Sequence, residues 1–219
     1  MTQISVLLVD DHAIVRAGYR QLISTTSDIS VIGEAATAEE CCKLYQKLQP
    51  DVVVMDLNLP GMSGLETIRR ICGKTDTFDT PKVLAFSMHD EAAYVERALN
   101  AGASGYLSKS CEPELLIAAI YAVAKGQRYI EPILQERVKH LSGDGDANTQ
   151  SSAGLDALSP REFDVFCLLA QGKPCKQAAA DLYLSEKTVS NYATQIKNKL
   201  GVRTLNELTR VAYQQGVAF

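Results

Sequence analysis

A carboxylate that could take part in covalent chemistry follows a buried apolar run. Asp56 comes directly after Val52-Val53-Val54-Met55, and the loop residues Pro60 and Gly61 follow it. A continuous run of this kind is typical of a strand buried on both faces, as in a parallel sheet. Asp56 is therefore expected at the carboxyl end of that strand, the edge at which open α/β sheets bind ligands. Taken alone, the residue could equally cap the next helix.

Three other apolar runs also end in polar residues. Asp10 and Asp11 follow one run, Ser87 ends a second, and Lys109 follows a third. Parallel strands would bring all of these to one edge of the sheet. Crowded carboxylates repel one another unless a cation joins them, and oxygen ligands suit Mg²⁺, which also takes a phosphate oxygen. Lys109 could pair with Asp56 and later with a phosphate, and Ser87 offers a hydroxyl to the same phosphate. The set predicts a phosphoryl-accepting aspartate. The alternative is that Asp10 and Asp11 only start a helix.

Strand and helix patterns alternate through the first 125 residues. Expected strands span 4–9, 30–34, 51–56, 82–87 and 104–108, and expected helices span 12–24, 37–48, 64–72, 89–99 and 112–125. Thr37 and Glu40 have the spacing of a capping box. The alternation predicts an α/β fold, a doubly wound five-stranded parallel sheet in the order 2-1-3-4-5 with helices on both faces.

The pattern changes after this segment. Residues 127–141 are weakly helical, and 142–154 contain no large apolar residue and are rich in Gly, Ser and Asp, which predicts a flexible linker. Helical periodicity without strands then returns in four segments, at 159–171, 176–183, 185–200 and 204–214. The short joint at 182–185 indicates a helix-turn-helix in a small all-α domain. We therefore expect domains at 1–125 and 156–219, joined by a linker at 126–155.

The distribution of charge indicates different tasks for the two parts of the chain. Residues 1–155 carry 14 Lys and Arg against 20 Asp and Glu, a net of −6, and residues 156–219 carry 8 against 6, a net of +2. An acidic part suits a cation and a mildly basic part suits nucleic acid.

The six cysteines include no CxxC pair, which favours reduced thiols. No apolar run is long enough to span a membrane and no signal peptide is evident, so we expect a cytoplasmic protein with no membrane partner.

The first 125 residues resemble the receiver domain of response regulators. The matching segments are Val9-Asp10-Asp11, Met55-Asp56-Leu-Asn-Leu-Pro-Gly-Met-Ser-Gly64, Phe86-Ser87-Met88 and Gly105-Tyr106-Leu-Ser-Lys109. The resemblance implies that a sensor histidine kinase phosphorylates Asp56. It implies that Asp11, Asp56 and the Asn58 carbonyl hold Mg²⁺, with Asp10 acting mainly through water. It also implies that Ser87 and Tyr106 respond to the phosphate, Tyr106 by turning inward.

Two receiver positions depart from the common pattern. Ser110 stands where many receivers have proline after the lysine, and Met88 stands where a small residue is common after the serine or threonine. Met88 could partly cover the phosphate and alter its lifetime.

The C-terminal helices resemble the LuxR-type helix-turn-helix of NarL/FixJ response regulators. The matching segments are Leu158-Ser-Pro-Arg-Glu162, Leu168-Leu-Ala-Gln-Gly172, Leu184-Ser-Glu-Lys-Thr-Val189 and Lys199-Leu-Gly-Val202. The resemblance implies that the helix after Ser185 enters the major groove of double-stranded DNA, and that phosphorylation favours a homodimer. Candidate DNA contacts are Lys187, Thr188, Ser190, Asn191, Thr194 and Lys197.

This segment also departs from its family. A lysine is common at Ser190, a basic residue is frequent at Thr194, and a larger apolar residue is usual at Ala178. Serine, asparagine and threonine can still bond bases and phosphates.

The leading hypothesis is a phosphorylation-dependent DNA-binding transcription regulator of a bacterial two-component system, and not an enzyme. One alternative is a receiver-containing regulator whose C-terminal helices act by protein–protein contact. The other is a hydrolase with an aspartyl nucleophile. Such enzymes usually carry Asp-x-Asp after the first strand, whereas Asp56 follows the third. The sequence leaves open the cognate kinase, the promoters, activation or repression, the dimer interface and the phosphoryl lifetime.

Overall fold

The computed structural model describes residues 3–73, 81–143, 154–215 and 217, with the side chains of 140–143 excepted. The chain divides into two compact units, one containing residues up to 90 together with 94–135, and the other containing 91–93 together with residues from 136 onward. Each unit is described by itself. Among the described residues, no helix has the length and apolar character that crossing a membrane requires.

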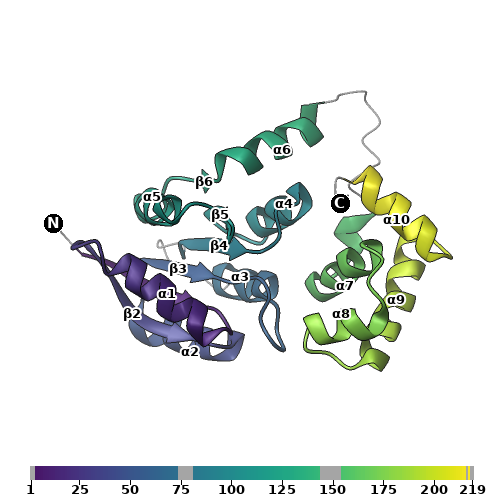
Figure 1. The fold of residues 1–219 in the computed structure, drawn as a ribbon, viewed down its shortest axis with the longest axis horizontal. Coiled ribbons are helices and arrows are strands. Elements are labelled where there is room, and N and C mark those ends of the chain that lie inside the picture. Colours follow the sequence, from purple (N-terminus) through teal and green to yellow (C-terminus); the bar gives the residue numbers. More distant parts are fainter. Residues whose placement is uncertain (1–2, 74–80, 144–153, 216, 218–219) are drawn as a thin grey trace. The chain divides into compact units, whose positions relative to one another are not determined.

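The first unit is built on a parallel six-stranded sheet in the order β2-β1-β3-β4-β5-β6 (Figure 1). The strands are β1 (Ile4–Val9), β2 (Ile29–Ala35), β3 (Val52–Met55), β4 (Val83–Ser87), β5 (Gly105–Ser108) and β6 (Tyr129–Ile130). All neighbouring pairs are parallel, so every strand ends at the same edge. The predicted doubly wound α/β fold and the order of its first five strands are confirmed.

The number of strands differs from the prediction of five. Tyr129 and Ile130 pair with Gly105 and Tyr106 and add β6 at the edge beyond β5. A strand of two residues is too short for its periodicity to be recognised in the sequence. The helix α6 (Pro132–Gly143) follows, within the stretch that the sequence predicted as weakly helical.

The helices of this unit have local start signals in the sequence. They are α1 (Ala13–Ile23), α2 (Ala38–Leu48), α3 (Gly64–Cys72), α4 (Ala92–Asn100) and α5 (Pro113–Ala124). Thr37 caps α2 and Ser63 caps α3, each by accepting a backbone N–H three residues on. The carboxylate of Glu40 accepts the N–H of Ala36 at 2.8 Å and not that of Thr37, so the predicted capping box is not formed.

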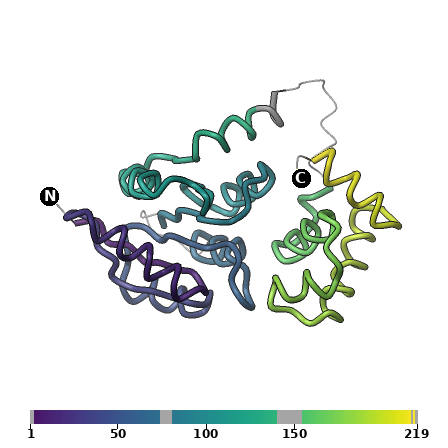
Figure 2. Tube along the Cα trace, in the orientation of Figure 1, coloured from purple at the N-terminus to yellow at the C-terminus, as the bar shows by residue number. Residues whose placement is uncertain are grey.

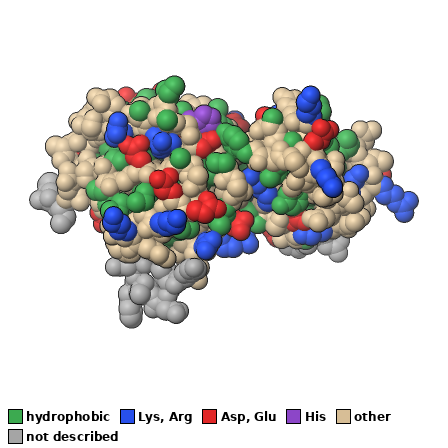
Figure 3. All heavy atoms as spheres, turned by 90° about the horizontal axis from the view of Figure 1, so that it is seen from below, with side chains coloured by type: hydrophobic (Ala, Val, Ile, Leu, Met, Phe, Trp, Pro, Cys, Tyr) green, Lys and Arg blue, Asp and Glu red, His purple; other side chains and the backbone are tan. Residues whose placement is uncertain are grey.

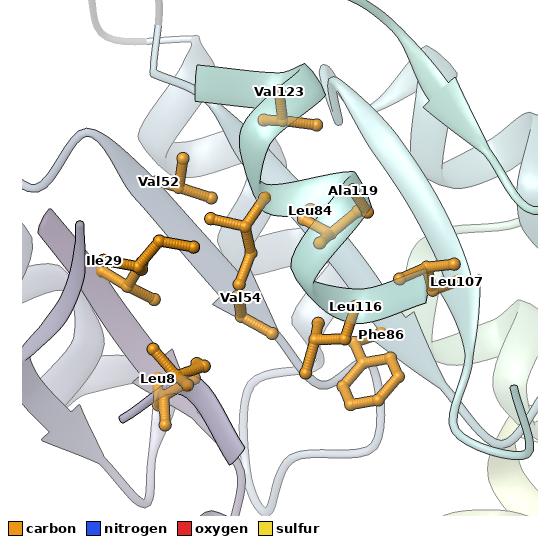
Figure 4. Packing of buried hydrophobic residues seen from close by; sticks show 13 residues of the cluster. Leu8, Ile29, Val52, Val54, Leu84, Phe86, Leu107, Leu116, Ala119 and Val123 are labelled. Carbon is orange, nitrogen blue, oxygen red and sulfur yellow. The ribbon is translucent and has the colours of Figure 1, made fainter. Parts of the chain in front are cut away.

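The apolar runs predicted as strands form the core. Figure 4 shows Val52, Val54, Leu84 and Phe86 packed beneath α5, whose Leu116 and neighbouring apolar residues face them. Strand residues of the other sheet face, such as Leu7 and Met55, are also fully buried. Burial on both faces explains why these runs are continuous rather than alternating.

The second unit is helical, as predicted. It contains the short 3₁₀ helix η1 (Leu155–Ala157) and α7 (Pro160–Ala170), α8 (Cys175–Asp181), α9 (Glu186–Leu200) and α10 (Leu205–Gln214), traced from green to yellow in Figure 2. Helix α7 contacts the other three, and Phe163, Phe166, Val189, Ile196 and Leu208 are fully buried. Ser159 and Glu162 form a reciprocal capping box at the start of α7. Residues 144–153 of the predicted flexible linker lie outside the described residues.

Gly64 permits α3 to begin directly against Asp56, which generates a prediction. A Cβ atom at Gly64 would lie 2.2 Å from the carbonyl oxygen of Asp56 and 2.5 Å from Cα of Leu57. Because the obstacles are backbone atoms, we expect Gly64→Ala to lower the free energy of unfolding by about 3 kcal/mol. Urea denaturation followed by circular dichroism measures this change.

Gly18 in α1 is the matched control, because a Cβ there would meet no atom within 4 Å. Gly18→Ala should be neutral or stabilise the protein by up to about 1 kcal/mol, since alanine favours a helix. Equal stability of Gly64→Ala and the parent protein would refute the claimed close approach.

Candidate functional site

Lys109 lies at the centre of an acidic cluster at the carboxyl edge of the sheet. Its Nζ is 2.6 Å from Oδ2 of Asp10 and 2.6 Å from Oδ2 of Asp56. The side chains of Lys109, Asp10 and Asp56 are only 9, 6 and 3% exposed. The ion pair expected from the sequence is therefore present, and Lys109 in addition joins two carboxylates from different strand ends.

The backbone of neighbouring strands holds these residues in place. The N–H of Asp56 donates to the carbonyl of Val9 at 2.8 Å, and the N–H of Lys109 donates to the carbonyl of Ser87 at 2.7 Å. The residues that leave β3 and β5 are thus still hydrogen-bonded to the ends of β1 and β4. The side chains converge because parallel pairing continues one residue beyond each strand.

Burial and the ion pairs act in opposite directions on the protonation of this cluster. Burial raises the pKa of Asp56 to about 6, although the charge of Lys109 and hydrogen bonds from Lys109 and Asn58 oppose this. Burial alone would lower the pKa of Lys109. The charge of Asp56 and hydrogen bonds to both carboxylates outweigh that effect, and the pKa of Lys109 lies above its ordinary value. Lys109 is thus charged across the physiological pH range, while the Asp56 carboxylate is basic enough to bind a cation or an electrophile.

The remaining oxygens of the cluster suit a hard cation. Oδ1 of Asp10 accepts the N–H of His12 at 2.8 Å, and Oδ1 of Asp56 accepts the N–H of Asn58 at 2.9 Å. Ligand atoms of Asp10, Asp11 and His12 lie within 4.8 Å of one another. Two of these three groups offer carboxylate oxygens, the donor type that Mg²⁺ prefers, and the third offers an imidazole nitrogen. His12, with Nδ1 2.7 Å from Oδ1 of Asp11, was not predicted as part of this cluster.

Ser87 and Tyr106 both meet His89, a residue that sequence reasoning missed. The Oγ of Ser87 accepts the N–H of His89 at 3.2 Å, and the hydroxyl of Tyr106 donates to the carbonyl of His89 at 2.8 Å. Tyr106 is fully buried, in the inward position. The His89 ring stacks on Tyr94, with centroids 3.9 Å apart, and its Nε2 is 3.3 Å from Oδ1 of Asn58. Helix α4 begins at Ala92, later than predicted, and His89 lies before it. The only sequence signal was the position of His89 two residues after Ser87.

The two receiver departures have distinct environments. Met88 is 67% exposed at this edge. Ser110 replaces the common proline, and its Oγ lies 2.6 Å from Oγ of Ser108. The pair of hydroxyls constrains the turn on either side of Lys109, as a proline ring would constrain it on one side.

The predicted DNA contacts share one face of α9 in the second unit. Lys187, Ser190, Asn191 and Thr194 are exposed, and Thr188 and Lys197 are partly exposed. The opposite face buries Val189, Ala193 and Ile196 against the rest of the unit. Two of the candidate side chains also make local contacts. The Oγ1 of Thr188 is 2.7 Å from Oγ of Ser185, and Thr194 donates to the carbonyl of Ser190.

Some basic residues of this unit are committed to the fold. Lys199 donates to Glu162 at 2.6 Å and to the carbonyl of Ala157 at 3.1 Å, and Lys173 pairs with Asp181 at 2.7 Å. On the face of the molecule in Figure 3, Lys and Arg side chains are scattered and do not gather into one continuous area. Lys187 and Lys197 are therefore the lysines of α9 that make no contact with Glu162, and Lys176, Arg203 and Arg210 of this unit are also exposed.

Two family models match the chain. Residues 6–121 match the response regulator receiver domain, and residues 156–212 match the luxR family of bacterial regulatory proteins. The chain is 39% identical to the transcriptional activator protein ExaE of Pseudomonas putida, over 97% of both chains. It is 36% identical to the response regulator UvrY of Escherichia coli, over 98% of this chain and 95% of that protein.

Solved structures agree with this relationship. The response regulator ChrA of a heme-sensing two-component system covers 99% of this chain with 32% identity and a TM-score of 0.54. The structure of RcsB from Salmonella enterica, bound to promoter rprA in the presence of the phosphomimetic BeF₃⁻, matches 96% of this chain and 98% of that one, with 25% identity and a TM-score of 0.63.

The fold and the matches define a two-component response regulator. The chain belongs to the NarL/FixJ family, in which a receiver domain is joined to a LuxR-type helix-turn-helix. It is a phosphorylation-dependent DNA-binding transcription regulator, so the predicted family and function are confirmed.

The raised pKa of Asp56 predicts how stability depends on pH. In the unfolded chain an aspartate has a pKa of about 3.9, so between about pH 4 and 6 the folded protein binds more protons, and its free energy of unfolding falls as pH rises. Asp56→Asn removes this loss. In EDTA at pH 7.5 we expect the variant to be more stable by on the order of 2 kcal/mol, with the difference shrinking toward pH 4.

Asp51→Asn is the control of opposite sign. Although burial acts to raise the pKa of Asp51, hydrogen bonds from the N–H and hydroxyl of Ser5 lower it below its ordinary value. That variant should be less stable at neutral pH, again with a difference that shrinks in acid. Urea denaturation across the pH series measures both. An Asp56→Asn difference that does not change with pH would contradict the assignment.

Proposed function

We propose that Asp56 is the residue that a sensor histidine kinase phosphorylates. The carrying observation is the bridge from Lys109 to Asp10 and Asp56, which fixes a nucleophilic carboxylate beside a cation at the sheet edge. In this reaction an oxygen of Asp56 forms a bond to phosphorus while the bond between phosphorus and the donor breaks. The donor keeps the electron pair of that bond.

The neighbouring residues have roles that follow from their contacts. Lys109 would exchange its contact with the Asp56 carboxylate for a phosphoryl oxygen, while its bond to Asp10 keeps it in place. The hydroxyl of Ser87 accepts from His89, which leaves its own hydrogen available to a phosphoryl oxygen. Tyr106 would report the change from its inward position, through its bond to the His89 carbonyl.

Asp10 and Asp11 offer the carboxylate oxygens that Mg²⁺ prefers, and Asp56 lies next to Asp10 because both contact Lys109. We propose that Asp11, Asp56 and the carbonyl of Asn58 hold the ion and that Asp10 acts mainly through water. When bound, Mg²⁺ neutralises charge on the phosphoryl oxygens. Asp10 is committed to Lys109 and to the N–H of His12, which agrees with an indirect role.

The output is proposed to lie on α9. Residues 1–125 would be the receiver, 126–155 the linker and 156–219 the DNA-binding domain. Lys187, Thr188, Ser190, Asn191, Thr194 and Lys197 would contact double-stranded DNA, with base contacts from the polar side chains and phosphate contacts from the lysines. A homodimer formed on phosphorylation would raise the local concentration of two such domains. Because a kinase and DNA are the proposed partners, we propose that the protein acts in the cytoplasm.

The phosphoacceptor is tested directly by intact mass. Incubation with acetyl phosphate and Mg²⁺ should add the mass of one phosphoryl group, because Asp56 contacts Lys109 and follows β3, the strand paired with the one that ends in Ser87. Asp56→Asn should gain no mass. In Asp11→Ala the mass gain should no longer depend on Mg²⁺. Asp51→Asn serves as the control with an unchanged gain. The same mass gain in Asp56→Asn and in the parent protein would move the acceptor elsewhere.

The DNA interface predicts a shallow dependence on salt. Few lysines on α9 imply few neutralised phosphates, and each contributes about −0.9 to the slope of log affinity against log salt on B-DNA. Lys187→Ala should weaken binding to a mixed-sequence duplex and make the slope shallower by about 1 per protomer. Fluorescence anisotropy at several salt concentrations measures it, with the receiver variant Lys125→Ala as the control.

Two outcomes would contradict this interface. A slope near about −10 would reveal a basic surface away from α9. No binding even at low salt, with or without acetyl phosphate, would favour the alternative in which the helical domain acts by protein–protein contact.

A further inference from the structure

Glu131 occupies an unusual place between the phosphorylation site and α6. It follows β6 directly, and it is only 8% exposed although it carries a carboxylate. Buried carboxylates persist where hydrogen bonds compensate for lost hydration. Glu131 has such a bond, since its Oε2 accepts the N–H of Ser108 at 2.9 Å.

Glu131 makes hydrogen bonds to two residues of β5. Its own N–H donates to the carbonyl of Tyr106 at 3.1 Å, while its carboxylate holds the N–H of Ser108. Lys109 is the next residue, and its N–H donates to Ser87. One residue thus contacts the strand at Tyr106 and at the position before Lys109.

The turn around Lys109 is closed by a second set of bonds. The hydroxyls of Ser108 and Ser110 are 2.6 Å apart, the N–H of Ser110 donates to Oγ of Ser108, and the N–H of Cys111 donates to the carbonyl of Ser108. Movement of the Lys109 backbone therefore carries Ser108 with it, and Ser108 is bonded to Glu131.

Glu131 also starts α6. Its carbonyl accepts the N–H of Leu134 and of Gln135, both at 2.9 Å, so the first turn of α6 is built on the same residue. A change in the Lys109 turn can therefore reach α6 through Glu131, whose carboxylate binds Ser108 and whose carbonyl binds the first turn of α6. In the order of the chain, α6 follows β6 and precedes η1 and α7.

We propose that Glu131 is a positioning residue that fixes the Lys109 turn and couples phosphorylation of Asp56 to the first turn of α6. This inference rests on the proposed phosphorylation of Asp56. When Lys109 exchanges the Asp56 carboxylate for a phosphoryl oxygen, the turn shifts, and Glu131 transfers the shift to Leu134 and Gln135.

Hydrogen exchange of the full-length chain tests the coupling, with and without acetyl phosphate and Mg²⁺. Without phosphate, the amide of Ser108 should exchange about tenfold faster in Glu131→Ala, because a hydrogen bond to a charged acceptor is lost. With phosphate, the amides of Leu134 and Gln135 should change their exchange rate in the parent protein and not in Glu131→Ala. Glu131→Gln, which retains an acceptor oxygen, should restore both behaviours at least in part.

Glu136→Ala is the matched control, because this exposed glutamate lies on α6 and its substitution leaves the Ser108 contact intact. It should behave as the parent protein does. Intact mass measured on the same samples separates the two proposals. An absence of added phosphate would overturn the proposed acceptor and this inference with it. Full phosphorylation of Glu131→Ala with parent-like changes at Leu134 and Gln135 would overturn the coupling alone.

Discussion

A buried lysine shared by two carboxylates is the interaction on which this site depends. Lys109 contacts Asp10 and Asp56 at 2.6 Å, and all three side chains are less than a tenth exposed. Removing the shared lysine would leave two carboxylates buried without their cation, and breaking a buried ion pair in this way typically costs about 3–5 kcal/mol. The arrangement therefore requires that the ends of β1, β3 and β5 stay in register, and it makes the site sensitive to any event that changes the charge of Asp56.

The parallel sheet satisfies this requirement through its edge. Backbone bonds from Asp56 to Val9 and from Lys109 to Ser87 continue the pairing past the ends of the strands. Gly64 lets α3 start in contact with the Asp56 backbone, which leaves little room for this segment to move. The segments that can respond to a phosphoryl group are then those on the other side of Lys109, where His89, Tyr106 and Glu131 are joined by hydrogen bonds.

The second unit uses an ion pair for a different purpose. Lys199 at the end of α9 contacts Glu162, whose side chain is 4% exposed and whose carboxylate also closes the capping box of α7. The pKa of Glu162 is accordingly below its ordinary value: burial opposes the shift, and the bonds from Lys199 and Ser159 outweigh it. This contact orients the helix that carries the candidate DNA contacts, and it removes one lysine from the charge that could meet phosphates.

The sequence by itself determined the features that arise from local patterns. Continuous apolar runs predicted β1, β3, β4 and β5, because both faces of a parallel sheet are buried. The starts of α3, α7 and α9 agree with the expected bounds because each is capped by a serine, Ser63, Ser159 or Ser185, and an N-cap is a contact within a few residues. Residues at the strand ends predicted the cluster of Asp10, Asp56 and Lys109, because parallel topology brings all such ends to one edge.

Only the tertiary structure decided which partners distant residues take. β6 has two residues and exists because β5 offers a free edge. The carboxylate of Glu40 accepts the N–H of Ala36 and not that of the N-cap Thr37. Lys199 contacts Glu162, which lies 37 residues away in the sequence. His89 and Glu131 look ordinary in the sequence. Their importance comes from hydrogen bonds to groups 17 to 31 residues away, including Tyr106, Ser108 and Asn58. No local pattern encodes such contacts, because they depend on where separate strands and helices come to rest.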